Sequence, residues 1–181
     1  MRRALARLRG FRRAERGATA VEFAMTAGPM IFLMLAIFEY ALVYLVSSTL
    51  DSAMRSASRQ IRTGEAQSTS MTASQYKTLV CNNMGWLKGD CPTNLDVDSR
   101  VFTSFTATSD PSPTTGGAFD KAKLKWAMGA EGDIVLVSAY YRWQLLTSSL
   151  LAGLSSPMYG SGYAAVTARA AFRNEPFGGG A

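Results

Sequence analysis

Hydrophobic residues are distributed unevenly along this chain. Residues 18–46 are almost wholly apolar and carry charge only at Glu22 and Glu39. A helix of that length would extend about 43 Å, which exceeds the roughly 30 Å hydrocarbon core of a bilayer. The pattern therefore predicts a single membrane-spanning helix over residues 18–46.

The helical spacing of apolar residues continues beyond this segment. Asp51 and Arg55 are spaced as a pair on the polar side, and Thr63-Gly64 offers a helix stop. We therefore expect the helix to continue as a spine over residues 47–63. This segment could be the spine helix of a pilin or a juxtamembrane helix that packs on its own domain, and the apolar stripe is compatible with both. The stripe consists of Val46, Leu50, Ala53, Met54, Ala57 and Ile61.

Residues 64–177 are predicted to form an α+β domain. Thr72 to Met84 has the pattern of a short capped helix, and Leu95–Phe105, Asp133–Trp143 and Gly162–Phe172 have the patterns of strands. A turn of helix is expected at 145–154, and residues 178–181 are expected to be a flexible tail. No long crossover helix separates the last two strands, so the simplest fold is a small antiparallel sheet packed against the spine helix.

The positive charge is concentrated at one end. The whole chain has a formal charge of +6, and residues 1–17 contain seven arginines and one glutamate, so the remainder is neutral. An arginine-rich segment directly before an apolar helix places the N-terminus in the cytoplasm and the C-terminal domain in the periplasm of a bacterial inner membrane. The neutral remainder offers no basic stripe for nucleic acid.

The composition argues against an enzyme. The chain has no histidine and only two cysteines, so the usual general base and a zinc cage are excluded. We predict no catalytic, cofactor or metal site. Asp96 and Asp98 alternate along a strand and are expected to form a solvated face.

Cys81 and Cys91 lie ten positions apart and flank turn-forming residues. In an oxidising periplasm such a pair favours a disulfide. Two separate buried thiols are the alternative.

The junction between the basic segment and the apolar helix reads Arg16-Gly17-Ala18-Thr19-Ala20-Val21-Glu22-Phe23. This junction resembles a prepilin cleavage site. In type IV pilin-like proteins a dedicated peptidase cuts after glycine, and a glutamate occupies the fifth mature position. The resemblance implies cleavage between Gly17 and Ala18, which would remove residues 1–17. Glu22 would then be the fifth mature residue and Phe23 the sixth. An uncleaved signal anchor is the alternative.

The chain as a whole resembles the TadE-like family of tight-adherence (Flp-type) pilus assembly proteins. Besides the junction, the resemblance rests on Pro29, Glu39, Gly132-Asp133-Ile134-Val135 and the terminal Arg173-Asn174-Glu175-Pro176-Phe177. The resemblance implies a minor pilin or pseudopilin that acts in pilus initiation or assembly. Its implied partners are other pilin-like subunits, the assembly platform, the prepilin peptidase and the membrane, with no cofactor. Glu22, Phe23 and Glu39 would be the subunit-assembly residues.

Some alternatives remain open. The chain could instead be an uncleaved, membrane-anchored periplasmic binding or adhesin module. Glu39 could simply mark the periplasmic end of the membrane helix. Pro29 lacks an amide hydrogen, so we expect a kink or local unwinding near Gly28.

Overall fold

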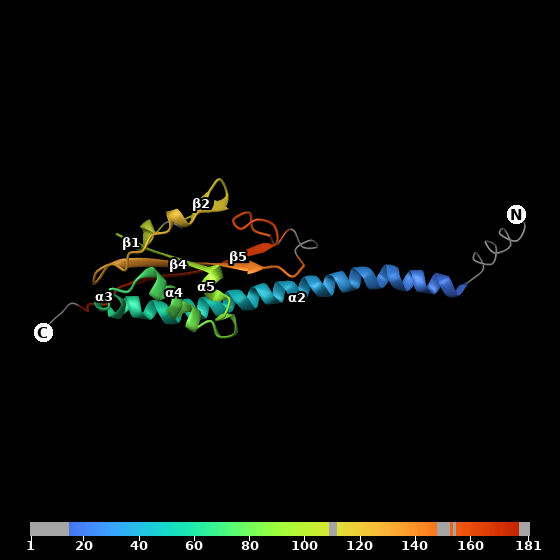
Figure 1. Ribbon diagram of the computed structural model, residues 1–181, viewed down its shortest axis with the longest axis horizontal. Coiled ribbons are helices and arrows are strands. Elements are labelled where there is room, and N and C mark those ends of the chain that lie inside the picture. Colours follow the sequence, from blue (N-terminus) through green and yellow to red (C-terminus); the bar gives the residue numbers. More distant parts are fainter. Residues whose placement is uncertain (1–14, 109–111, 148–152, 154, 178–181) are drawn as a thin grey trace, which may run out of the picture. The chain divides into compact units, whose positions relative to one another are not determined.

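The computed structural model describes residues 15–108, 112–147, 153 and 155–177. The chain divides into two compact units, Met1–Phe38 and Glu39–Ala181, and helix α2 (Glu15–Arg62) belongs in part to each (Figure 1). Most of the predicted leader and all of the predicted tail, residues 1–14 and 178–181, lie outside the described residues.

Over Thr19–Arg62, α2 is long and apolar enough to cross a membrane, with a mean hydropathy of 2.1 in its most apolar stretch. Large apolar side chains such as Ile31 and Ile37 are exposed along it. The helix is unbroken at Gly28 and Pro29, so the expected local unwinding does not occur in the described helix.

The second unit contains the predicted antiparallel sheet. Its strands are β1 (Leu95–Phe102), β4 (Ile134–Gln144) and β5 (Tyr163–Arg173), in the order β1-β4-β5. Val97 lies opposite Ala139, and Tyr141 lies opposite Val166. The α+β prediction of a long N-terminal helix with a small antiparallel sheet is confirmed.

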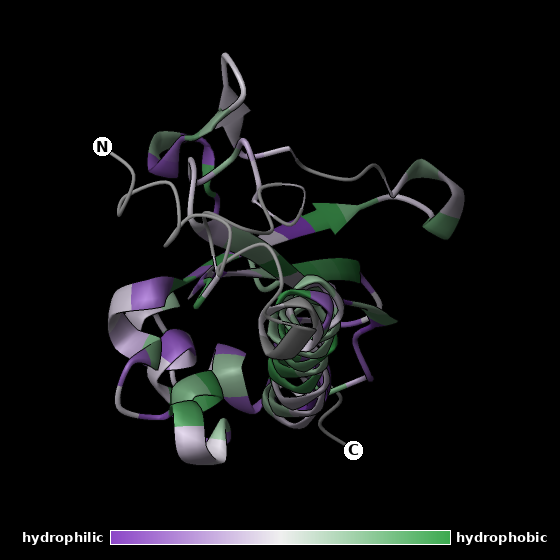
Figure 2. Cartoon of the chain, turned by 90° about the vertical axis from the view of Figure 1, so that its right-hand side faces the viewer, coloured by the Kyte–Doolittle hydropathy of each residue, from purple (hydrophilic) through white to green (hydrophobic). Residues whose placement is uncertain are grey.

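One face of this sheet packs on the part of α2 that belongs to the second unit, as the view along the helix shows (Figure 2). The predicted apolar stripe, including Leu50, Met54 and Ile61, is fully buried. It shares one core with Val97, Val137 and other side chains of the inner sheet face. The stripe therefore packs on the chain's own domain, which is compatible both with a spine helix and with a juxtamembrane helix.

Short helices complete this side of the core: α3 (Glu65–Ser68), α4 (Ala73–Asn82), η1 (Gly85–Leu87) and α5 (Cys91–Asn94). Thr72 caps the start of α4 in a capping box, in which its hydroxyl accepts a hydrogen bond from the backbone amide of Gln75. The buried Tyr76 hydroxyl lies 2.9 Å from the Ser58 hydroxyl of α2. This contact joins α4 to the spine helix.

The other sheet face is covered by the chain between β1 and β4 and by the segment before β5. This cover includes η2 (Phe105–Ala107), β2 (Thr114–Thr115), β3 (Ala118–Phe119) and η3 (Lys121–Lys123). Phe119 packs against Tyr140 of β4 and against Tyr159, with ring centroids 5.8 and 5.2 Å apart.

This cover makes the expectation of a solvated Asp96–Asp98 face wrong for Asp98, which is buried. Residues after η3 run beside β1, where the Ser99 amide donates to the Lys125 carbonyl over 2.8 Å. The Asp98 carboxylate is held there by Arg100 at 2.8 Å and by the Lys125 amide at 2.6 Å. Its charge is thus compensated inside the domain.

Candidate assembly site

The bond expected to be cleaved, between Gly17 and Ala18, lies in the first turn of α2. A Cβ built on Gly17 would meet no atom within 4 Å. An alanine-sized side chain at position 17 would therefore cause no clash with the described chain.

The side chains of Glu22 and Phe23 point outward from α2. Phe23 is 75% exposed, and Glu22 is also exposed. The Thr26 hydroxyl donates to the Glu22 backbone carbonyl over 2.9 Å. The Glu22 carboxylate has no hydrogen-bond or ion-pair partner among the described residues. It can therefore pair with a group that lies outside them.

Glu39 is in a different environment. Its side chain is only 1% exposed, and its carboxylate accepts three hydrogen bonds from the loop after β4. The donors are the Leu146 amide at 3.1 Å, the Thr147 amide at 2.8 Å and the Thr147 hydroxyl at 2.9 Å. These bonds offset the cost of taking the charge out of water.

The loop is held in position by its own neighbours. Leu145 is buried, and its amide donates to the Gly162 carbonyl over 2.9 Å, next to the start of β5. Two successive amides then point at the same carboxylate, which is the arrangement of a small anion-binding nest. The structure thus gives the Glu39 carboxylate partners within the chain, which the Glu22 carboxylate does not have among the described residues.

The C-terminal residues singled out in the sequence hold the far end of the domain together. The Asn174 side-chain amide donates to the Met128 and Ala130 carbonyls, both over 2.9 Å. The Glu175 amide donates to the Arg62 carbonyl at the end of α2, and the two side chains form an ion pair at 3.2 Å. These contacts are structural ones within the chain.

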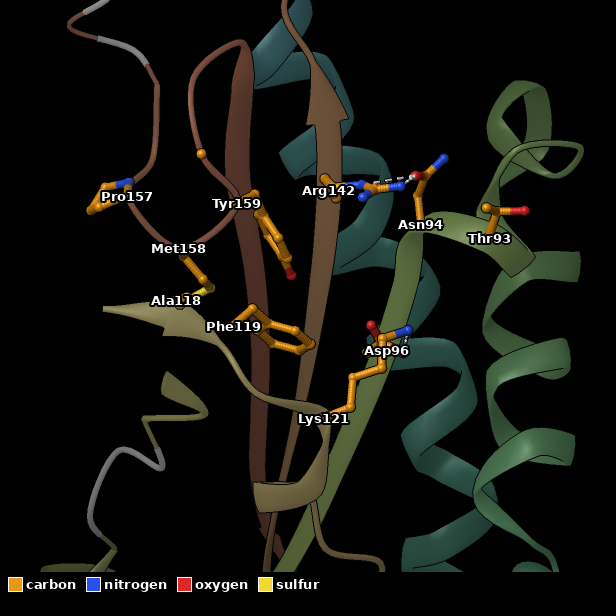
Figure 3. A pocket seen from close by; sticks show the side chains of 11 residues that line it. Thr93, Asn94, Asp96, Ala118, Phe119, Lys121, Arg142, Pro157, Met158 and Tyr159 are labelled. Atoms are coloured by element: carbon orange, nitrogen blue, oxygen red, sulfur yellow. Dashed lines mark hydrogen bonds and ion pairs between the residues drawn. The ribbon is translucent and has the colours of Figure 1, made fainter. Parts of the chain in front are cut away.

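A pocket of about 480 Å³ lies between α5, β1, β4 and the segment before β5 (Figure 3). Arg142 donates to the Asn94 side-chain oxygen over 3.2 Å and lies 5.0 Å from the centre of the Tyr163 ring. Asp96 is 3.1 Å from the Lys121 ammonium and 3.9 Å from that of Lys77. The charged side chains of this pocket are therefore already partnered within the chain.

Burial shifts two pKa values beside this pocket. It lowers the pKa of Lys77, although Asp96 opposes the shift, and it raises the pKa of Tyr159. The Tyr159 hydroxyl is buried without a hydrogen-bond partner among the described residues. No group of three or more acidic, histidine or cysteine side chains that could hold a metal occurs in the described part of the chain.

Cys81 and Cys91 form the predicted disulfide, with their Cα atoms 5.5 Å apart. Both residues are buried, and the bridge ties the end of α4 to the start of α5.

A family model described as TadE-like protein matches residues 17–59. The matched segment contains Gly17, Glu22, Phe23, Glu39 and most of the spine helix. The resemblance to this family is thereby confirmed over that segment. No curated protein and no solved structure matches the chain.

Proposed function

We propose that this chain is a subunit of a tight-adherence pilus system, anchored in the inner membrane by the apolar part of α2 and processed between Gly17 and Ala18. It acts as a minor pilin or pseudopilin in pilus initiation or assembly. Its domain faces the periplasm, and its partners are other pilin-like subunits and the assembly platform. The match of the TadE-like family model to residues 17–59 supports a role in Tad pilus assembly.

The observation that carries the proposal is the exposed carboxylate of Glu22 on an apolar helix. An ionised carboxylate facing lipid costs about 2.5 to 3.5 kcal/mol at the bilayer centre and less near the headgroups. Glu22 lies near one end of the apolar segment, so its cost is at the lower end until it gains a partner. A partner outside the chain would remove that cost. Glu22 is therefore suited to drive association within the membrane.

Removal of the leader would create the complementary charge. A free α-amine at Ala18 has a pKa near 8 and is cationic in the same leaflet as Glu22. The two groups of one chain are one helical turn apart and could pair with each other. Pairing of Glu22 with the amine of a neighbouring subunit would instead fix the axial register between the two helices, and we favour this arrangement.

The proposal is tested by Glu22→Ala in cells that assemble the pilus. We expect normal membrane insertion, leader removal and disulfide formation, with loss of co-isolation with other pilin-like subunits and loss of pili. Glu22→Asp should restore part of the assembly. Met25→Ala, which truncates another exposed side chain of the same helix, is the matched control.

Processed Glu22→Ala protein that assembles at the wild-type level would contradict the assembly role. Wild-type protein that keeps its leader and never co-isolates with pilin-like subunits would favour an uncleaved binding or adhesin module.

A further inference from the structure

We infer that the sheet domain docks on the outer lipid surface through Tyr40, Tyr44 and Leu146, and that the Glu39 carboxylate holds the Leu146 loop against α2 at that surface. This inference rests on the membrane anchoring in the proposed function. It adds a contact surface and a lipid partner to the domain itself.

The three side chains are large, apolar in most of their area, and exposed in the second unit. Tyr40 is 64%, Tyr44 69% and Leu146 68% exposed. Tyr40 and Tyr44 are one turn apart and share one side of α2. The Leu146 amide is bonded to Glu39, the residue next to Tyr40. All three side chains therefore lie at the same end of the domain.

The length of the apolar helix places the lipid boundary at this end. A helix over residues 19–38 spans about 30 Å, which matches the hydrocarbon core. Glu39 then falls at the outer boundary of that core, and the loop supplies the hydrogen bonds that lipid cannot supply. The span predicted from hydropathy, residues 18–46, also includes Val46, which is buried in the domain.

The residue types fit a headgroup layer. Tyrosine is enriched at membrane interfaces, because its ring prefers apolar surroundings and its hydroxyl prefers water. Tyr40 lies about 3 Å beyond the end of this span, within a headgroup layer about 5 to 7 Å thick. Tyr44 lies about 9 Å beyond it, and its side chain, which leans toward the helix N-terminus, reaches back to that layer. Ile37 and Phe38, the last residues of the proposed span, are themselves exposed and apolar and directly precede Glu39 in the sequence.

The hydrogen bonds to the Glu39 carboxylate explain how the loop stays level with the lipid boundary. Two backbone amides and one hydroxyl share one carboxylate, so the end of β4 is tied to a fixed position on α2. Without the carboxylate the residues after Leu145 would lose their attachment to α2, and Leu146 would leave the lipid surface.

The test uses the full chain with its disulfide, reconstituted in vesicles of phosphatidylethanolamine and phosphatidylglycerol. A nitroxide label is placed at Leu146→Cys, with reference labels at Ile31→Cys for the membrane core and at Thr115→Cys, an exposed site on β2, for water. Collisional access to oxygen reports lipid, and access to a water-soluble nickel chelate reports water.

We expect the oxygen-to-nickel access ratio at Leu146 to lie between the two references and to be several-fold higher than at Thr115. Adding Glu39→Gln or Thr147→Val should move the Leu146 ratio towards the Thr115 value. The Ile31 ratio should not change.

A Leu146 label as water-accessible as the Thr115 label, beside a lipid-embedded Ile31 label, would overturn this inference alone. A Leu146 label shielded from both reagents would overturn it in favour of a protein partner. A water-accessible Ile31 label would overturn the membrane anchoring and with it the proposed function.

Discussion

Thr147 binds one oxygen of Glu39 twice, through its amide at 2.8 Å and its hydroxyl at 2.9 Å, across 108 positions of the chain. Both donors come from the loop that leads out of β4, and the acceptor is on α2. A charged residue in an apolar segment is thus part of the folded domain. Its hydrogen bonds join the helix to the sheet.

Removing this acceptor should destabilise the domain. Glu39→Leu leaves the Leu146 and Thr147 amides without their acceptor, and a lost charge-assisted hydrogen bond costs about 1.5 to 3 kcal/mol. Thr147→Val removes only the hydroxyl bond and should cost about 1 kcal/mol. Thermal unfolding of the full chain in detergent, followed by near-ultraviolet circular dichroism, measures both. Equal stability of Glu39→Leu and wild type would contradict the structural role of this carboxylate.

Gly64, which follows α2, should tolerate no larger side chain. Its φ is +82°, and an added Cβ would overlap the Phe177 ring. We expect Gly64→Ala to cost about 1 to 3 kcal/mol of unfolding free energy from backbone strain, and more from the overlap. Gly117→Ala is the matched control, since Gly117 has a φ of +90° with nothing within 4 Å. If both variants lose the same stability, the contact with Phe177 contributes nothing.

The disulfide should stabilise the domain modestly. The bridge between Cys81 and Cys91 closes a loop of ten positions and so lowers the conformational entropy of the unfolded chain. This contributes up to about 3 kcal/mol to the free energy of unfolding. The double variant Cys81→Ala/Cys91→Ala should unfold at a lower temperature by a corresponding amount. A reductant should lower the unfolding temperature of the wild type and leave that of the variant unchanged. A wild-type temperature insensitive to complete reduction would count against this role.

Tyr76 should make the domain sensitive to alkali. Burial raises its pKa to about 12 from the ordinary value of 10.0, although the hydrogen bond with Ser58 partly offsets this. The pKa of Tyr76 is higher in the folded state than in the unfolded state. Its contribution to the stability of the fold is therefore complete below pH 10 and is lost as the pH rises towards 12. The unfolding free energy should fall by at most about 1.4 kcal/mol per pH unit from this residue.

Tyr76→Phe should flatten the fall in stability between pH 10 and 12, measured by denaturant unfolding at several pH values. A profile identical to that of the wild type would show that another group dominates the alkaline loss of stability.

Local patterns were sufficient to predict the main elements. Apolar spacing predicted α2, and the observed β4 and β5 begin and end within about one residue of the expected strands. Thr72 signalled the start of α4 because a capping residue acts on amides only a few positions away.

Contacts distant in sequence were not predictable in this way. No local pattern pairs Glu39 with Thr147, and nothing near Asp98 announces that the chain after η3 returns to cover it. The exposed Glu22 is the opposite case. Its expected role came from a motif, and its exposure on α2 is compatible with that role without testing it.

The central claim is that the chain becomes a pilus subunit through removal of residues 1–17. The most direct test is to measure the mass of the intact protein extracted from the membranes of pilus-producing cells. The account predicts a mature chain that begins at Ala18, carries one disulfide and retains all of α2 from that residue onward. Gly17→Leu, whose added Cβ would meet no atom within 4 Å, should leave the mass of the full precursor. Wild-type protein recovered from such cells with Met1 or Arg2 at its N-terminus would contradict the account.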